Sequence, residues 1–182
     1  MLNEYKAHVD ERAKQNIPPL PLSADQTSDL IELLKSENDE SEYLLNLLKE
    51  RVPAGVDQSA YVKAAFLADI TSGKTLSPYI NKIEAVRILG TMLGGYNIEP
   101  LIKCLRIDEL GDEAANALSN TLLIFDAFNE ILFEKSIFFR FVKLRFALVK
   151  SAPDKSALVK SAPDKSALVK SAPDKSALVK SA

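Results

Sequence analysis

The chain has 182 residues, of which 47% are hydrophobic and 26% are charged, as is ordinary for a soluble globular protein. The first residues, LNEYKAHVDER, are too charged for the apolar core of a secretory signal peptide, and no run of about 18 uncharged apolar residues could cross a membrane. We therefore expect a cytoplasmic protein without a membrane span. The single cysteine, Cys104, excludes an intramolecular disulfide and cannot hold an iron–sulfur cluster, and we expect it to be a small buried hydrophobe.

Charge divides the chain into two parts. Residues 1–131 hold 12 Lys and Arg against 21 Asp and Glu, a net charge of −9. Residues 132–182 hold 11 basic against 4 acidic residues, a net charge of +7. The overall charge of −2 therefore conceals an acidic segment followed by a basic one.

The first part is predicted to be all-α, because apolar residues recur at helical spacing up to about residue 130. A first helix over residues 2–15 ends before a linker with three prolines, Pro18, Pro19 and Pro21. Ser23 and Gln26 have the spacing of a capping box, which predicts the start of a second helix that carries Leu30, Leu33 and Leu34.

Two more helices follow an acidic turn at residues 36–42. We expect Tyr43, Leu44, Leu47 and Leu48 to be the buried residues of the third helix. Asp57 can cap the fourth helix, and Gly73 lies where a C-terminal glycine belongs. The apolar positions predicted for this fourth helix are Tyr61, Val62, Ala65, Phe66 and Ile70.

A helix-to-helix corner is predicted between residues 89 and 102. The fifth helix starts at a capping pattern, Asn81 with Glu84, and its apolar positions are Ile83, Val86, Leu89 and Met92. Gly94 and Gly95 can adopt the left-handed conformations that end a helix, and Asn97 can cap the next one. Pro100 would then lie harmlessly in the first turn of a sixth helix, at about residues 98–105. A seventh helix opens at Asp112 and is expected to bury Leu118, Leu122, Phe125 and Phe128.

The pattern changes near residue 131. Residues 132–149 hold five of the eight phenylalanines, interleaved with Arg and Lys. Residues 150–182 repeat the decapeptide SAPDKSALVK, whose prolines interrupt helices and whose small side chains bury little apolar surface. We expect a disordered, non-globular tail, with domain bounds at 1–131, 132–149 and 150–182.

Four blocks in the first part resemble the N-terminal HEAT-like domain of the bacterial aconitate hydratase B family. They are MLNEYKAHVDERA (1–13), RVPAGVDQSAYVKAAFLADI (51–70), LGTMLGGYNIEPLI (89–102) and ALSNTLLIFDAF (117–128). The resemblance implies a HEAT-like stack of short antiparallel helices. The family interconverts citrate and isocitrate in the tricarboxylic acid cycle with a [4Fe–4S] cluster, but the domains that hold this cluster are missing here.

The resemblance also implies a function. It indicates a truncated fragment that acts as a non-catalytic interaction domain and associates with aconitase catalytic domains or with itself. In the family this domain helps to shape the passage to the active site. Gly94, Gly95, Tyr96 and Asn97 are therefore candidates for an interdomain contact, against the alternative of a tight structural turn.

Other interpretations remain. The basic tail could bind RNA or another nucleic acid electrostatically, and B-type aconitases are known as messenger-binding proteins, but the tail is the part without family resemblance. A frameshift near codon 131 would give a product with no selected function. Gly73-Lys74-Thr75 imitates the end of a phosphate-binding loop, yet Ala68 stands where that motif needs its first glycine. His8, the only histidine, is expected on a solvated helix face.

Overall fold

The computed structural model of the chain describes residues 1–121. The described part is built from α-helices and one π-helical turn, with no strand among its elements, so the all-α prediction is confirmed there. The elements are α1 (Leu2–Lys14), α2 (Ala24–Leu34), α3 (Ser41–Asn46), η1 (Leu47–Arg51), α4 (Gln58–Ser72), α5 (Lys82–Gly90), α6 (Ile98–Leu105) and α7 (Gly111–Asn120).

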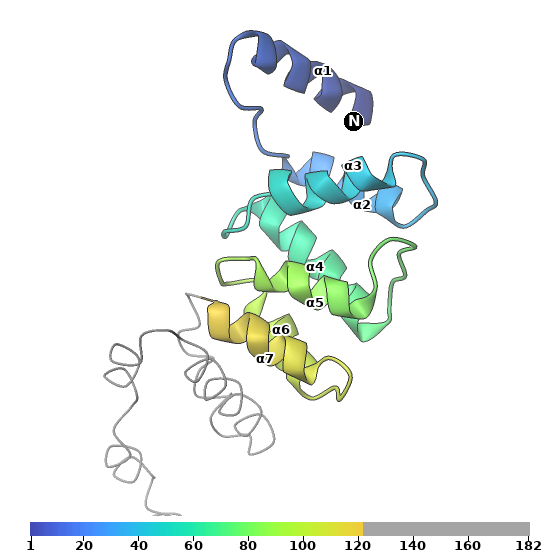
Figure 1. The fold of residues 1–182 in the computed structure, drawn as a ribbon, viewed down its shortest axis with the longest axis vertical. Coiled ribbons are helices and arrows are strands. Elements are labelled where there is room, and N and C mark those ends of the chain that lie inside the picture. Colours follow the sequence, from blue (N-terminus) through green and yellow to red (C-terminus); the bar gives the residue numbers. More distant parts are fainter. Residues whose placement is uncertain (122–182) are drawn as a thin grey trace, which may run out of the picture. The chain divides into compact units, whose positions relative to one another are not determined.

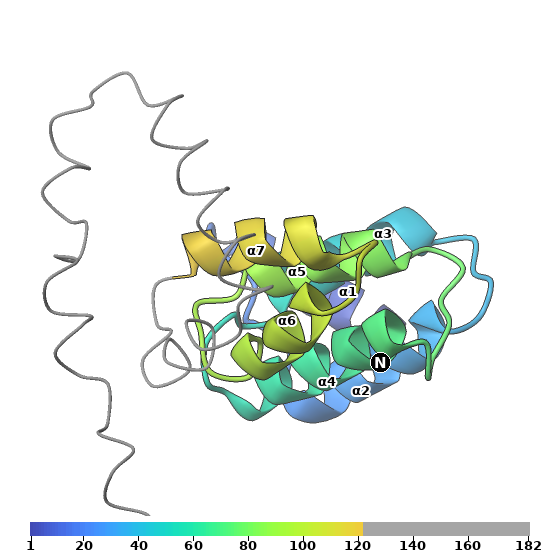
Figure 2. The same cartoon turned by 90° about the horizontal axis from the view of Figure 1, so that it is seen from below.

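The helices after α1 are stacked in two layers. Figure 2 shows α2, α4 and α6 in one layer and α3, α5 and α7 in the other, and Figure 1 shows that they follow one another along the stack. Contacts join α2 to α4, α4 to α5, α5 to α7 and α6 to α7. Each helix therefore buries one side on neighbours that are close in the sequence, as in helical-repeat domains.

The core runs continuously through this stack. Leu30 of α2, Leu48 of η1, Leu67 of α4, Leu89 of α5 and Leu118 of α7 are each 0% exposed. Burial of a leucine side chain contributes about 2 kcal/mol relative to exposure, so these contacts across helices stabilise the stack far more than helix propensity does.

Several helix ends follow the local signals. Ser23 and Gln26 form the complete capping box: Ser23 Oγ accepts from the Gln26 N–H at 3.2 Å and Gln26 Oε1 accepts from the Ser23 N–H at 3.0 Å. Asn81 Oδ1 accepts from the Glu84 N–H at 2.8 Å at the start of α5. Gly73 ends α4 with a φ of 78°, as a left-handed C-terminal glycine should.

The buried side of α4 differs from the prediction. Tyr61 is 50% exposed and Ala65 is also exposed, whereas Lys63, Ala64 and Leu67 are buried. The physical reason is that α4 packs against α2, α5 and α6, and the direction of these neighbours, not the hydrophobicity of α4 alone, selects its inner side. The apolar stripe predicted for α5 is also incomplete, because Ile83 is 40% exposed.

The remaining predictions fall beyond the described part. Burial of Leu122, Phe125 and Phe128, the phenylalanine-rich segment 132–149 and the repeat tail 150–182 all lie outside the described residues. The domain bounds therefore stay predictions. Among residues 1–121, no helix has the length and apolar character needed to span a membrane.

Candidate functional site

The corner between α5 and α6 requires its two glycines. The backbone φ is 131° at Gly94 and 83° at Gly95, and residues other than glycine rarely adopt such values. A Cβ atom on Gly95 would also lie 3.3 Å from Cγ1 of Val56, tighter than an ordinary contact. The prediction of left-handed glycines at this corner is thus confirmed.

The sequence predicts that the Asn97 side chain caps α6, and this prediction is wrong. Its backbone lies in the helical region and the side chain makes no capping bond. Instead, the amide Nδ2 donates backwards to the carbonyl oxygens of Leu89 at 2.9 Å and Met92 at 3.4 Å. Because the Asn97 side chain is 0% exposed, these two bonds stabilise the corner from inside the protein. The Oδ1 atom of Asn97 has no hydrogen-bond partner among residues 1–121.

The corner lies on the segment that leads into α4. The Leu93 N–H donates to the Ala54 carbonyl at 3.0 Å, and the Tyr96 hydroxyl donates to the Val56 carbonyl at 3.2 Å. The ring of Tyr96 meets that of Tyr61 edge to face, with centroids 5.2 Å apart. Two stretches that are distant in the sequence are therefore held together here.

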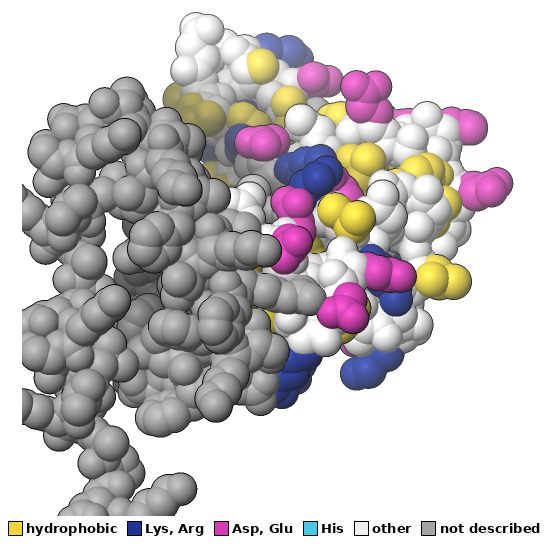
Figure 3. Space-filling model, turned by 60° about the horizontal axis from the view of Figure 1, so that its bottom comes forward, with side chains coloured by type: hydrophobic (Ala, Val, Ile, Leu, Met, Phe, Trp, Pro, Cys, Tyr) yellow, Lys and Arg dark blue, Asp and Glu magenta, His cyan; other side chains and the backbone are white. Residues whose placement is uncertain are grey.

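We define the corner patch as the four exposed apolar side chains at this junction. Their exposed fractions are 71% for Val56, 50% for Tyr61, 51% for Leu93 and 36% for Tyr96. On the view of Figure 3, hydrophobic side chains lie in small areas separated by acidic and basic ones. Apolar side chains gathered at one place on such a surface are typical of a contact site.

A groove continues from the corner patch along α4. Between α4 and α6 it has a volume of about 260 Å³, and between α2 and α4 a second hollow has about 250 Å³. Tyr61 and Ala65 line both hollows. At the α6 side, Lys103 Nζ lies 2.6 Å from Glu99 Oε1, and the hydrogen bond from Lys103 lowers the pKa of the Glu99 carboxyl. The groove therefore has a floor of small side chains and an exposed charged pair at its edge.

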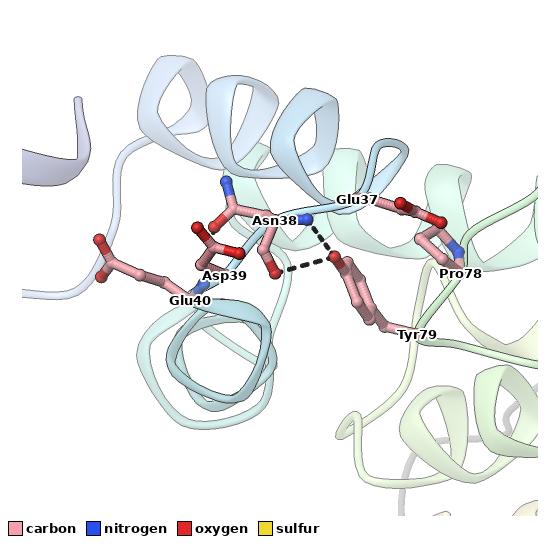
Figure 4. A pocket seen from close by; sticks show the side chains of 6 residues that line it. All are labelled: Glu37, Asn38, Asp39, Glu40, Pro78 and Tyr79. Atoms are coloured by element: carbon pink, nitrogen blue, oxygen red, sulfur yellow. Dashed lines mark hydrogen bonds between the residues drawn. The ribbon is translucent and has the colours of Figure 1, made fainter.

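A larger and more open hollow, of about 760 Å³, lies at the acidic turn. Figure 4 shows its lining residues, and these are Glu37, Asn38, Asp39, Glu40, Pro78 and Tyr79. The Tyr79 hydroxyl accepts from the Asn38 N–H and donates to the Asn38 carbonyl at 3.0 Å. These bonds tie the acidic turn to the segment before α5, so the structure explains this cluster as a loop anchor.

The described residues do not fit the family's cofactor. Within residues 1–121 no three His, Cys, Asp or Glu side chains are grouped so that they could hold a metal ion. The sequence contains one cysteine, whereas an iron–sulfur cluster normally needs several thiolates. Cys104 is 1% exposed, as predicted, and burial raises the pKa of its thiol more than the neighbouring Thr71 side chain lowers it.

The structure brings together only part of the predicted site. Gly95 and Tyr96 reach the surface of the corner, whereas Gly94 and Asn97 are buried and shape it from within. Gly73-Lys74-Thr75 follows a helix and not a strand, so it is a helix end. His8 is half-exposed on α1 and accepts a hydrogen bond from the linker, so the predicted solvated position holds only in part.

Sequence reasoning missed two residues. Lys63 is 1% exposed, and its ammonium has no hydrogen bond or ion pair among the described residues. Nothing in the sequence indicates that this lysine is buried. Gly90 allows close packing, since a Cβ there would lie 2.7 Å from the Cβ of Ala117. A glycine inside a predicted helix was the available signal for this contact between α5 and α7.

A two-layer stack of short helices, with a glycine corner between α5 and α6, defines an all-α helical domain. Residues 4–137 match the family described as the aconitate B N-terminal domain, and the chain belongs to this family. Aconitate hydratase B of Escherichia coli is 53% identical over 132 residues, and that of Synechocystis sp. is 52% identical over 135 residues. The Helicobacter pylori enzyme is 44% identical over 132 residues.

The matches cover most of this chain but little of the relatives. They include 72% of this chain for the Escherichia coli and Synechocystis proteins and 71% for the Helicobacter pylori protein. The same matches cover only 15% to 16% of the relatives' own lengths. The relatives are thus several times longer than the segment that they share with this chain.

Proposed function

We propose that the helical part of the chain, residues 1–131, acts as a non-catalytic protein-interaction domain of an aconitate hydratase B, and that the corner patch is the contact surface. The observation that carries this proposal is the exposed Tyr61–Tyr96 ring pair, with the exposed Val56 and Leu93 on the two stretches that hydrogen bonds join at the corner. In this proposal the partner is the catalytic part of the enzyme, which we expect in the large portion of the relatives outside the shared 15% to 16% of their length.

The chemistry of the patch supports binding. Tyrosine provides a large apolar surface with few rotatable bonds, and it is enriched among the residues that dominate binding energy. The Tyr96 ring is already held by its bond to the Val56 carbonyl and by Tyr61, so little conformational entropy remains to be lost when a partner covers it.

The side chains present also support a non-catalytic role. The chain has one histidine and one cysteine, and Cys104 is buried with a raised thiol pKa, which disfavours the nucleophilic thiolate. The aconitate hydratase activity named for the relatives is therefore assigned to the parts of those proteins outside the shared segment.

A binding experiment tests the proposal. The chain is mixed with an Escherichia coli aconitate hydratase B that lacks its own matching segment, and the dissociation constant is measured by isothermal titration calorimetry. We expect saturable binding, weakened at least about tenfold by the double change Tyr61→Ser and Tyr96→Ser, because loss of two anchors costs more than about 1.4 kcal/mol.

The matched control is Leu76→Ser, which removes an apolar side chain that is 80% exposed and belongs to no part of the corner patch. Equal weakening by the control and the patch variant would contradict the proposed surface. If no binding is seen and the sedimentation of the chain alone depends on its concentration, the partner is a second copy of the chain and not the catalytic part.

A second candidate rests on charge. Residues 132–182 carry a net charge of +7, which favours binding to nucleic acid through phosphate contacts. This candidate requires RNA affinity that falls steeply with salt and is lost when the chain ends at residue 131. Sequencing of the coding DNA from codon 120 onward tests the frameshift alternative, which requires that another frame resumes an aconitase-like sequence.

A further inference from the structure

The linker between α1 and α2 is held by an almost complete set of hydrogen bonds. Carbonyl oxygens of three consecutive residues accept from side chains: Pro18 from Arg12 Nε at 2.7 Å, Pro19 from the Arg51 guanidinium, and Leu20 from the Tyr5 hydroxyl at 2.7 Å. Because Pro18, Pro19 and Pro21 have no N–H, the segment 18–22 has only two backbone donors.

The two donors have different acceptors. The Leu22 N–H donates to the carbonyl of Arg51 at 2.9 Å, a group that does not titrate. The Leu20 N–H donates to Nε2 of His8 at 3.1 Å. One of the two backbone donors of the linker therefore depends on the chain's only histidine.

This bond defines the protonation state of His8. A backbone N–H can only donate, so Nε2 must offer its lone pair and the proton of the neutral ring must be on Nδ1. A second proton would convert Nε2 into a donor that faces another donor. The bond would then be lost, and Leu20 would move away from the ring.

We propose that His8 is a pH-sensitive latch, which binds the Leu20 N–H of the proline linker when the imidazole is neutral and releases that N–H when it is protonated, while the carbonyl bonds of residues 18–20 remain. Histidine is the side chain that ordinarily changes charge between about pH 5 and 8. The latch is local, because α1 has other attachments: Tyr5 is 2% exposed, and Lys6 pairs with Glu40 and lies 5.2 Å from the ring centroid of Tyr43.

Charged side chains lie near the latch on two elements. On α1, Glu4, Glu11 and Arg12 each lie one helical turn from His8. From η1, Arg51 bonds to Pro19 and to the hydroxyl of Tyr5, whose ring lies 5.9 Å from that of His8. The linker itself contributes no titratable side chain between residues 18 and 22.

Amide exchange with water in the full chain, measured by NMR, tests the latch at about pH 7.5 and about pH 5.5. After correction for the intrinsic pH dependence of exchange, protection of the Leu20 amide should fall about tenfold at the lower pH, as expected for one lost hydrogen bond. The Leu22 amide, bonded to Arg51, is the internal control and should keep its protection.

Two variants complete the experiment. His8→Gln offers an amide oxygen that accepts but does not titrate, so Leu20 should stay protected at both pH values. His8→Ala removes the acceptor and should leave Leu20 unprotected at both. The proposal would be overturned if Leu20 protection in the wild-type chain did not fall at the lower pH. It would also be overturned if protection fell equally at Leu20 in His8→Gln, or equally at the Leu22 amide.

Discussion

Tyr61 of α4 and Tyr96 of the α5–α6 corner meet edge to face, with ring centroids 5.2 Å apart. Both rings remain partly exposed, and the Tyr96 hydroxyl is tied to the Val56 carbonyl. The pair joins two of the sequence blocks that resemble the aconitate hydratase B family, so it links the family's sequence signature to a single surface.

The first prediction concerns the coupling of these rings. Tyr61→Ala and Tyr96→Ala should each reduce the free energy of unfolding by about 1 kcal/mol, and the double variant should lose about 0.5 to 1 kcal/mol less than the sum. Urea denaturation followed by helical circular dichroism measures all four chains. Strict additivity would show that the ring contact contributes nothing.

The second prediction concerns Asn97. Asn97→Ala should destabilise the chain by about 2 kcal/mol, because the carbonyl oxygens of Leu89 and Met92 would lose the buried Asn97 amide and Leu89 would keep only the Met92 N–H at 3.2 Å. The control is Asn120→Ala, at an exposed asparagine that also donates to a carbonyl, and it should cost less than about 0.5 kcal/mol. Thermal unfolding compares the two, and similar costs would contradict the inner role of Asn97.

The third prediction concerns Gly90. Alanine ordinarily favours a helix over glycine by about 1 kcal/mol, yet Gly90→Ala should destabilise this chain by about 1 to 3 kcal/mol. The reason is that the new Cβ would lie 2.7 Å from the Cβ of Ala117 on α7. Adding Ala117→Gly should recover part of the loss in chemical denaturation. A Gly90→Ala chain more stable than the wild type would show that α5 and α7 separate at little cost.

The fourth prediction concerns Lys63 and pH. Burial lowers the pKa of Lys63 from 10.5 to about 8, and the nearby Glu50 carboxylate only partly opposes this shift. Below about pH 8 the folded chain carries a buried ammonium at full cost. Between that pH and 10.5 the folded state has released a proton that the unfolded state still binds, so stability rises with pH.

The matched variant is Lys63→Met, which fills a similar volume without a titrating group. At pH 7 it should be more stable than the wild type by up to about 3 kcal/mol, and this difference should vanish as the pH approaches the ordinary lysine value. Denaturation curves of both chains across the alkaline range give the difference directly. A difference independent of pH would mean that the ammonium reaches water in the folded state.

Local signals in the sequence determined much of the described fold. The capping box of Ser23 and Gln26, the left-handed Gly73 and the glycine corner at Gly94 and Gly95 depend on a few neighbouring residues. The physical reason is that backbone conformation at helix ends is decided by nearby donors, acceptors and Cβ atoms. These features could therefore be predicted before any neighbouring helix was placed.

The tertiary structure alone decided which sides of the helices face one another. It exposed Tyr61 and buried Lys63 on α4, and it turned the amide of Asn97 back to Leu89. Helical periodicity gives the spacing of a stripe but not the direction from which α2, α5 and α6 approach α4. Contacts between residues distant in the sequence set that direction, and they also assembled the corner patch.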